Sequence, residues 1–160
     1  MSRWFAVVDG AADPRLYDVV ASAREHACLY SGEYDSETRK ALPYLAALDD
    51  GEDLPRLWRT HETGRFWGIL MRSDARLDDL RRHLRHFTTA RLPLGEVVLF
   101  RFWDPRVFAT FAISESDDQV AAFFAPIELA IADLGEEGRK RYEWQDGILV
   151  DGQRPARGTA

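Results

Sequence analysis

VVLFRFWDPRV, residues 97–107, is the stretch that predicts most about the local structure of this chain. Its first seven residues place apolar side chains on both faces, which is typical of a buried strand. Asp104 and Pro105 then predict a helix start, because aspartate caps free amide groups and proline at the first helical position loses no hydrogen bond. We therefore expect a buried strand over 97–103 that leads directly into a capped helix.

Arg101 is the residue of this stretch that an apolar strand does not explain. A buried guanidinium without a partner is strongly destabilising, so we expect a carboxylate close to it. Asp9 and Asp104 are the candidates. The resulting ion pair could serve the architecture alone, or it could anchor a ligand in a binding crevice, and the sequence leaves both possibilities open.

Working outward, apolar alternation and helical periodicity follow one another along the rest of the chain. Strands are expected near residues 4–9, 26–30, 65–73, 89–92 and 128–150, and the strand at 89–92 is expected to be joined to the one at 97–103 through Pro93-Leu94-Gly95. Helices are expected after Asp13-Pro14, before Gly64, over 73–87, after Asp104-Pro105 and before Pro126. This pattern predicts a mixed α/β protein of the α+β kind, with a mixed β-sheet flanked by helices in a single domain.

Composition narrows the class of protein. The 160 residues carry a formal net charge of -6, which disfavours nucleic acid as a partner, and they contain no apolar run long enough for membrane insertion. Cys28 is the single cysteine, which fits a reducing compartment. We expect a cytoplasmic protein that needs no cofactor.

An enzyme is the main alternative. If the strands ending at Asp9, Arg72 and Trp103 were parallel, Asp9, Ser73, Arg101 and Asp104 would gather at one edge of the sheet, where open α/β sheets bind ligands. A small α/β hydrolase or nucleotide-binding enzyme could use such an Asp9/Arg101/Asp104 crevice. No nucleophile elbow, P-loop or dinucleotide glycine pattern accompanies these residues.

The helix over 73–87 carries two further candidates. His83 and His86 are close enough in sequence to share a metal, but no third ligand follows at a matching spacing, so we expect no metal site. Arg81, Arg82 and Arg85 form a basic face, which is interpreted either as solvated or as a site for an acidic protein partner.

Seven segments, taken in order, resemble one protein family. They are WFAVVDGAADPRL, CLYSGE, PYLAAL, FWGILMRS, LRRHLRHF, VLFRFWDPRVFATF and AAFFAPI, and together they extend over about residues 4–127. In this order and spacing they resemble the effector chaperones, or adaptors, of type VI secretion systems, a family long catalogued as a domain of unknown function.

This resemblance implies a bacterial protein that binds a secreted effector, a toxin, in the cytosol and helps to load it onto the spike protein. It implies no catalytic residues and therefore no enzyme. It places Asp9, Trp67, Arg101, Asp104 and Arg106 among the partner-binding or signature positions. Gly10, Ser31, Gly32, Gly68 and Pro105 complete the signature.

The resemblance marks out the first part of the chain, and the apolar pattern and polar composition of the remaining residues divide the rest. Residues 1–127 are expected to form the chaperone-like domain, 128–150 to add strands to the same domain, and 151–160 to form a disordered tail. Many members of the family carry a further helical lobe that helps to hold the effector. In its place, the strands at 127–150 are expected to offer an edge for pairing with another chain.

Overall fold

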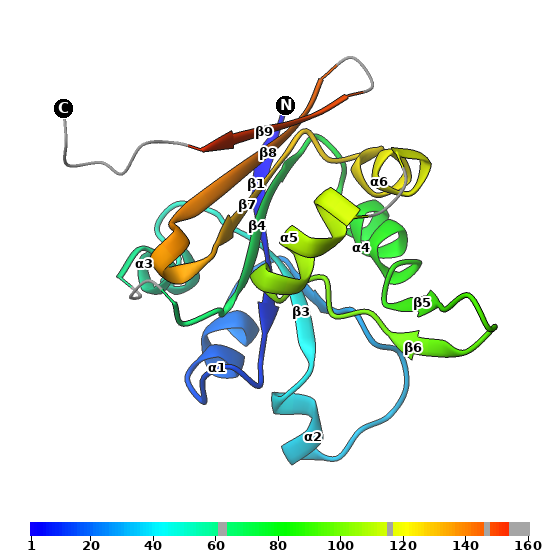
Figure 1. Cartoon of the computed structure of the whole chain (residues 1–160). Helices are drawn as coiled ribbons and strands as arrows, with labels where there is room; N and C mark the ends of the chain where they lie inside the picture. The colour runs from blue at the N-terminus through cyan, green and yellow to red at the C-terminus, as the bar shows by residue number, and fades with distance from the viewer. Residues whose placement is uncertain (61–63, 115–116, 146–147, 154–160) are drawn as a thin grey trace, which may run out of the picture.

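A computed structural model describes residues 1–60, 64–114, 117–145 and 148–153 of the chain. Most of its strands join one central sheet (Figure 1). In spatial order these are β2 (His26–Cys28), β3 (Pro43–Ala47), β1 (Arg3–Asp9), β4 (Gly68–Ser73), β7 (Leu129–Asp133), β8 (Arg139–Gln145) and β9 (Ile148–Gln153). Each pairing between described neighbours is antiparallel.

Helices cover both faces of this sheet. They are α1 (Leu16–Ala21), α2 (Ser36–Lys40), α3 (Asp53–Thr60), α4 (Leu77–Arg85), α5 (Pro105–Ser114) and α6 (Asp117–Phe124), with a short 3₁₀ turn at Gly135–Glu137. Figure 1 shows α1 and α3 on one side of the sheet and α4, α5 and α6 on the other. The predicted α+β class, a sheet flanked by helices in one domain, is confirmed.

The central strand β1 separates two apolar cores because its side chains alternate between the faces of the sheet. Phe5 and Val7 pack with the side chains of α4, α5 and α6. Ala6 and Val8 pack with those of α1 and α3. A strand buried on both faces explains the uninterrupted apolar run that the sequence shows there.

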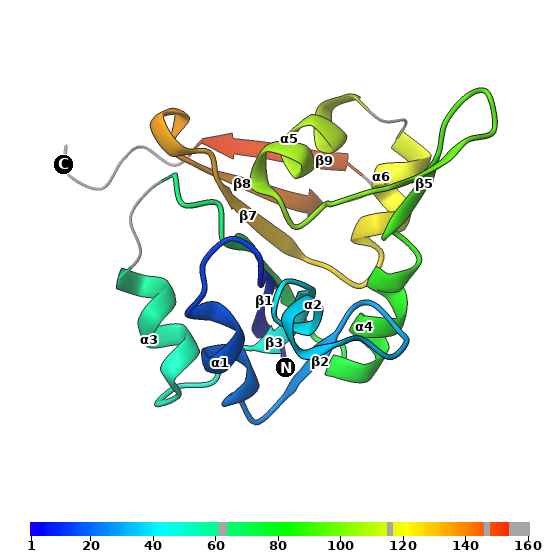
Figure 2. The ribbon, with the colours of Figure 1, turned by 90° about the horizontal axis from the view of Figure 1, so that it is seen from below.

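The stretch at 97–107 folds differently from the prediction. β6 spans only Val97–Leu99 and pairs with β5 (Thr89–Arg91) in a separate two-stranded hairpin. The buried strand expected over 97–103 is therefore wrong in two respects: the strand ends at Leu99, and its residues Val97–Leu99 are exposed. Phe102 and Trp103 are buried instead in the turn that precedes α5. Figures 1 and 2 both show this hairpin extending away from the main sheet.

The C-terminal strands extend the main sheet. β7, β8 and β9 follow one another by antiparallel pairing, and β9 is the last strand in the described part of the sheet. β9 continues to Gln153, beyond residue 151 where the tail was expected to begin. Residues 154–160 lie outside the described part of the chain. None of the described helices has the length and apolar character needed to cross a bilayer.

His83 makes the stability of this fold depend on pH. Its half-buried ring donates from Nε2 to the carbonyl of Phe123, 2.7 Å away, and so joins α4 to α6. Burial lowers the pKa of His83, so the unfolded chain takes up a proton on this ring at a higher pH than the folded chain does. The contribution of His83 to stability is therefore complete above about pH 6.5 and declines as the pH falls below it.

We expect His83→Gln to weaken this dependence, because the glutamine amide can donate but does not titrate. The measurement is urea denaturation at about pH 7.5 and about pH 5.5, on either side of the histidine titration. His86→Gln, an exposed change at the C-cap of α4, serves as the control and should alter the response much less than His83→Gln does. An identical loss of stability at low pH in His83→Gln would contradict the assignment.

Candidate functional site

Asp9 and Arg101 meet at the end of β1. Arg101 donates from a terminal guanidinium nitrogen to Asp9 Oδ2 at 2.7 Å, and the backbone amide of Ala11 donates to Asp9 Oδ1 at 3.0 Å. The carboxylate is nearly buried, whereas half of the arginine side chain is exposed. The prediction that Arg101 needs a carboxylate partner is confirmed, with Asp9 as that partner. The buried member of the pair is the aspartate.

Asp104 caps α5 and holds Arg106. Its Oδ1 accepts from the backbone amide of Arg106 at 2.9 Å, and the guanidinium contacts both carboxylate oxygens, at 3.0 and 2.8 Å. Burial by itself would raise the pKa of Asp104, but the hydrogen bonds from Arg106 outweigh burial and hold this pKa below its usual value. The carboxylate is therefore ionised at neutral pH.

The same three-residue geometry occurs before α1. Asp13 accepts from the backbone amide of Arg15 at 2.9 Å and from its guanidinium at 3.0 and 2.9 Å. These hydrogen bonds lower the pKa of Asp13 to about 2. The two Asp-Pro-Arg segments, residues 13–15 and 104–106, thus build the same turn in front of two helices.

Phe66 and Trp67 lie between these two turns. The Arg106 guanidinium stands 4.2 Å from the centre of the Phe66 ring, and that of Arg15 stands 5.5 Å from the Trp67 ring. Both distances are within the range of cation–π attraction. Phe66 has a positive φ of 52°, which is rare for an aromatic residue. Trp67 is buried and packs edge-on against Trp58.

Two signature glycines allow backbones to approach one another beside this cluster. A Cβ on Gly10 would lie 2.3 Å from the carbonyl oxygen of Lys40, and one on Gly68 would lie 1.9 Å from that of Val7. No side chain fits at either distance. These two signature glycines are therefore required for the backbone segments to pack.

The parallel strands from which the four-residue crevice was predicted do not form. β1 and β4 are antiparallel, and Ser73 pairs with Arg3 at the end of β1 opposite to Asp9. Ser73 Oγ donates to the carbonyl of Pro126 and accepts from the amide of Ala75. Asp9, Arg101 and Asp104 do lie together, but without Ser73. The hypothesis was wrong because strand direction depends on pairing between distant segments.

The chemistry available to this cluster is limited by its own ion pairs. A general acid must hold a proton near neutral pH, whereas Asp104 is kept ionised by Arg106. Arg101 and Arg106 likewise use N–H donors of their guanidinium groups in ion pairs with carboxylates of the same domain. In the described residues, no three histidine, cysteine, aspartate or glutamate side chains stand close enough to hold a metal. The arrangement is suited to fixing the turn at 100–106 against β1 and β4.

The hairpin exposes apolar side chains that sequence patterns did not identify. We call residues 89–99 the β5–β6 arm. Leu94, Val97 and Leu99 on this arm are 93%, 60% and 65% exposed. Leu92 and Val98 are exposed as well. Contiguous exposed apolar side chains of this kind mark binding surfaces in soluble proteins.

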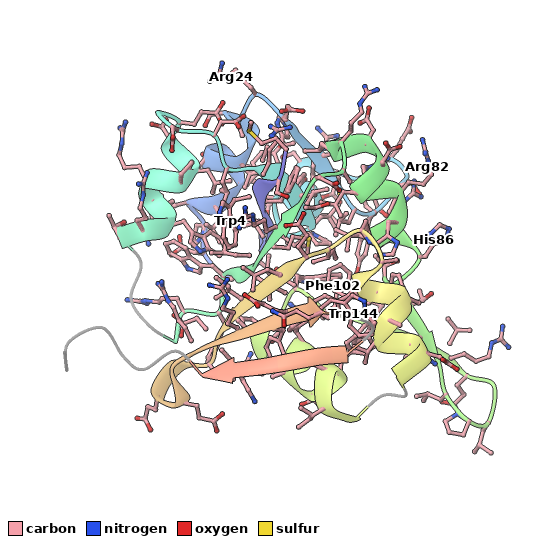
Figure 3. All side chains as sticks on the ribbon, turned by 90° about the horizontal axis from the view of Figure 1, so that it is seen from above. Trp4, Arg24, Arg82, His86, Phe102 and Trp144 are labelled. Carbon is pink, nitrogen blue, oxygen red and sulfur yellow. The ribbon has the colours of Figure 1, made fainter. Side chains whose placement is uncertain are left out.

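A groove runs beside the base of the arm. It has a volume of about 810 Å³ and lies between α4, the loop at 29–34 and the arm; we call it the α4 groove. Arg81, Arg82 and Arg85 line it, together with Leu99 of the arm. Figure 3 shows Arg82 and His86 directed outward from α4. Tyr30 also lines the groove and packs edge-on against Trp103, so the groove adjoins the Arg101 turn.

Fold and site together define a single α+β domain. Its site has two ion pairs within the domain, Asp9 with Arg101 and Asp104 with Arg106, and an apolar arm that is exposed. Residues 4–122 match the family model described as "Domain of unknown function (DUF4123)". The chain belongs to this family. No curated protein and no solved structure matches it.

Removing the Arg101 side chain is expected to lower the free energy of unfolding by about 1–2 kcal/mol, because the nearly buried Asp9 carboxylate loses its charged partner. The half-exposed position of Arg101 keeps the loss below that of a fully buried pair. Arg101→Ala can be compared with the unaltered chain by urea denaturation. Arg56→Ala removes an exposed arginine from a 3.7 Å pair on α3 and should cost less than about 0.5 kcal/mol. Equal losses in the two variants would contradict the role given to Asp9.

Proposed function

We propose that this chain is a chaperone, or adaptor, that binds an effector of a type VI secretion system in the cytosol and helps to load it onto the spike protein. The proposal begins with the seven ordered segments over residues 4–127, which resemble that family. Membership of the family matched over residues 4–122 is consistent with it.

The observation that carries the proposal is the exposed β5–β6 arm. Val97 and Leu99 leave apolar surface in water on a hairpin outside the main sheet. Burying such surface against another protein is favourable at about 25 cal/mol per Å². A domain that retains an apolar surface of this kind is suited to binding a client protein that presents apolar surface of its own.

The two ion pairs at the end of β1 and the start of α5 favour a binding protein over an enzyme. Asp9 is engaged by Arg101, and Asp104 by Arg106. An enzyme using these residues would need a carboxylate free to exchange a proton with a substrate or to attack it, whereas each of these two carboxylates is held by an arginine of the same domain. We therefore assign the cluster to holding the turn that carries the arm's C-terminal end.

Co-expression tests the proposal. The tagged chain is produced together with the protein encoded beside it, and separately with the neighbouring spike protein, and each pair is purified on the tag. We expect the effector to co-purify and to become more soluble than when it is produced alone. If the intact chain retains neither protein, the chaperone assignment fails.

The Asp104→Asn variant distinguishes the chaperone proposal from the enzyme alternative. On our account, this variant changes stability and leaves no catalytic activity to lose. Turnover of an ester or nucleotide substrate by the unaltered chain, abolished in a folded Asp104→Asn variant, would instead support an enzyme.

A further inference from the structure

The α4 groove differs in charge from the rest of the molecule. Among the described residues that line it are three arginines, Arg81, Arg82 and Arg85, against one aspartate, Asp78. The whole chain carries a formal net charge of -6. A cationic groove on an acidic protein concentrates a favourable potential for anions in one place.

The arginines are held so that they face the groove. Arg81 donates from Nε to the carbonyl of Cys28 at 2.8 Å, and Arg85 donates to Ser31 Oγ. Arg82 contacts Asp79 at 3.2 Å while both side chains remain largely exposed. Because a guanidinium has about five N–H donors, each of these contacts leaves donors that can bind a carboxylate.

The groove is continuous with the apolar arm. Thr89 and Leu99 belong to the arm and also line the groove. A ligand that occupies both surfaces must therefore combine negative charge with apolar side chains. A polypeptide segment meets this requirement, whereas a nucleic acid would bring many phosphates close to an acidic protein and would leave the arm's aliphatic side chains uncovered.

We propose that the α4 groove binds an acidic segment of the effector whose neighbouring apolar residues cover the β5–β6 arm. This inference rests on the proposed function and adds which surface is used and which chemistry it selects. Charge in the groove sets the position of the client, and the arm supplies most of the apolar burial.

The test compares two matched charge reversals in the full chain. Arg82→Glu with Arg85→Glu inverts the groove. Arg56→Glu with Arg59→Glu inverts two exposed arginines at the same spacing on α3, on the other face of the sheet. Binding of the purified effector is measured by calorimetry at about 50 mM and about 500 mM salt, since screening weakens charge pairing.

We expect the groove reversal to weaken effector binding by at least about tenfold and to remove most of its salt dependence, while the α3 reversal changes neither. An unaltered affinity after the groove reversal would overturn the inference and leave the chaperone function standing. An effector that fails to bind the unaltered chain would instead refute the function on which the inference rests. Thermal melting of both variants checks that they are folded.

Peptide probes test the chemistry without the effector. A peptide of about 12 residues that alternates glutamate with leucine should bind the unaltered chain and not the groove reversal. Equal binding of the matching lysine and leucine peptide would overturn the inference. So would tight binding of a single-stranded oligonucleotide of about 20 bases, or a dimer of this chain that the groove reversal dissociates.

Discussion

Gly68→Ala is expected to lower the free energy of unfolding by more than about 4 kcal/mol, the largest effect that we predict for a single substitution. Gly68 begins β4 and pairs with Val8 of β1 in the centre of the sheet. An added Cβ would lie 1.9 Å from the carbonyl oxygen of Val7. The clash involves backbone on both sides, so β1 and β4 must separate to relieve it.

Gly51→Ala provides the control for this prediction. Gly51 has a positive φ of 85°, but an added Cβ meets no atom within 4 Å. Its cost is therefore confined to the backbone conformation, about 1–2 kcal/mol. We expect Gly68→Ala to be largely insoluble or unfolded, whereas Gly51→Ala gives a normal urea transition at a slightly lower midpoint. A folded Gly68→Ala with a midpoint near that of Gly51→Ala would show that the close approach of β1 and β4 is not required.

Introducing charge on the β5–β6 arm is expected to have the largest effect on binding. Val97 and Leu99 lie two residues apart in β6, so their side chains point to the same side of the strand, and both are exposed. Val97→Glu with Leu99→Glu should weaken effector binding by at least about 100-fold, because buried apolar anchors at interfaces each contribute about 2 kcal/mol or more. The stability of the free chain should change by less than about 0.5 kcal/mol, as is usual for exposed positions.

Ile113→Glu is the matched control on α5. Ile113 is 71% exposed, comparable with the two residues of the arm, and it lies outside the arm. We expect this variant to bind the effector with unaltered affinity. If Ile113→Glu and the arm variant reduced binding equally, the interface would not be the arm, and a general effect of added negative charge would explain both results.

Local structure was predictable where the signal is short in range. The stripe of Leu77, Leu80 and Leu84 predicts α4, and those three side chains are buried against the sheet. Asp104-Pro105 predicts the start of α5 because capping involves only neighbouring residues. The apolar runs at 4–9 and 65–73 likewise predict strands, and β1 and β4 form there.

The Arg101 ion pair was predicted correctly from a premise that was partly wrong. We reasoned from an arginine buried in a strand, whereas Arg101 lies in a turn and is half exposed. The pairing holds because the requirement for a charged partner applies to either member, and Asp9 is the nearly buried one.

The hairpin at 89–99 was predicted from the turn at Pro93-Leu94-Gly95, but the exposure of its apolar side chains and the groove beside it could not be predicted from the sequence. Val97, Val98 and Leu99 have the composition of a core strand. The sequence does not distinguish an apolar residue buried in the core from one exposed at a binding surface. The α4 groove is formed by three segments, 29–34, 78–89 and the arm, that meet only in the folded chain. The direction of strand pairing also depends on such distant contacts, which is why the parallel crevice was wrong.

Titration calorimetry of the purified chain with the purified effector tests the central claim most directly. On our account, the two proteins form a saturable complex with a Kd below about 1 μM, and heat capacity falls on binding because apolar surface of the arm is buried. No measurable heat at several temperatures, with both proteins folded and at concentrations well above that Kd, would contradict the claim that this protein is an effector chaperone.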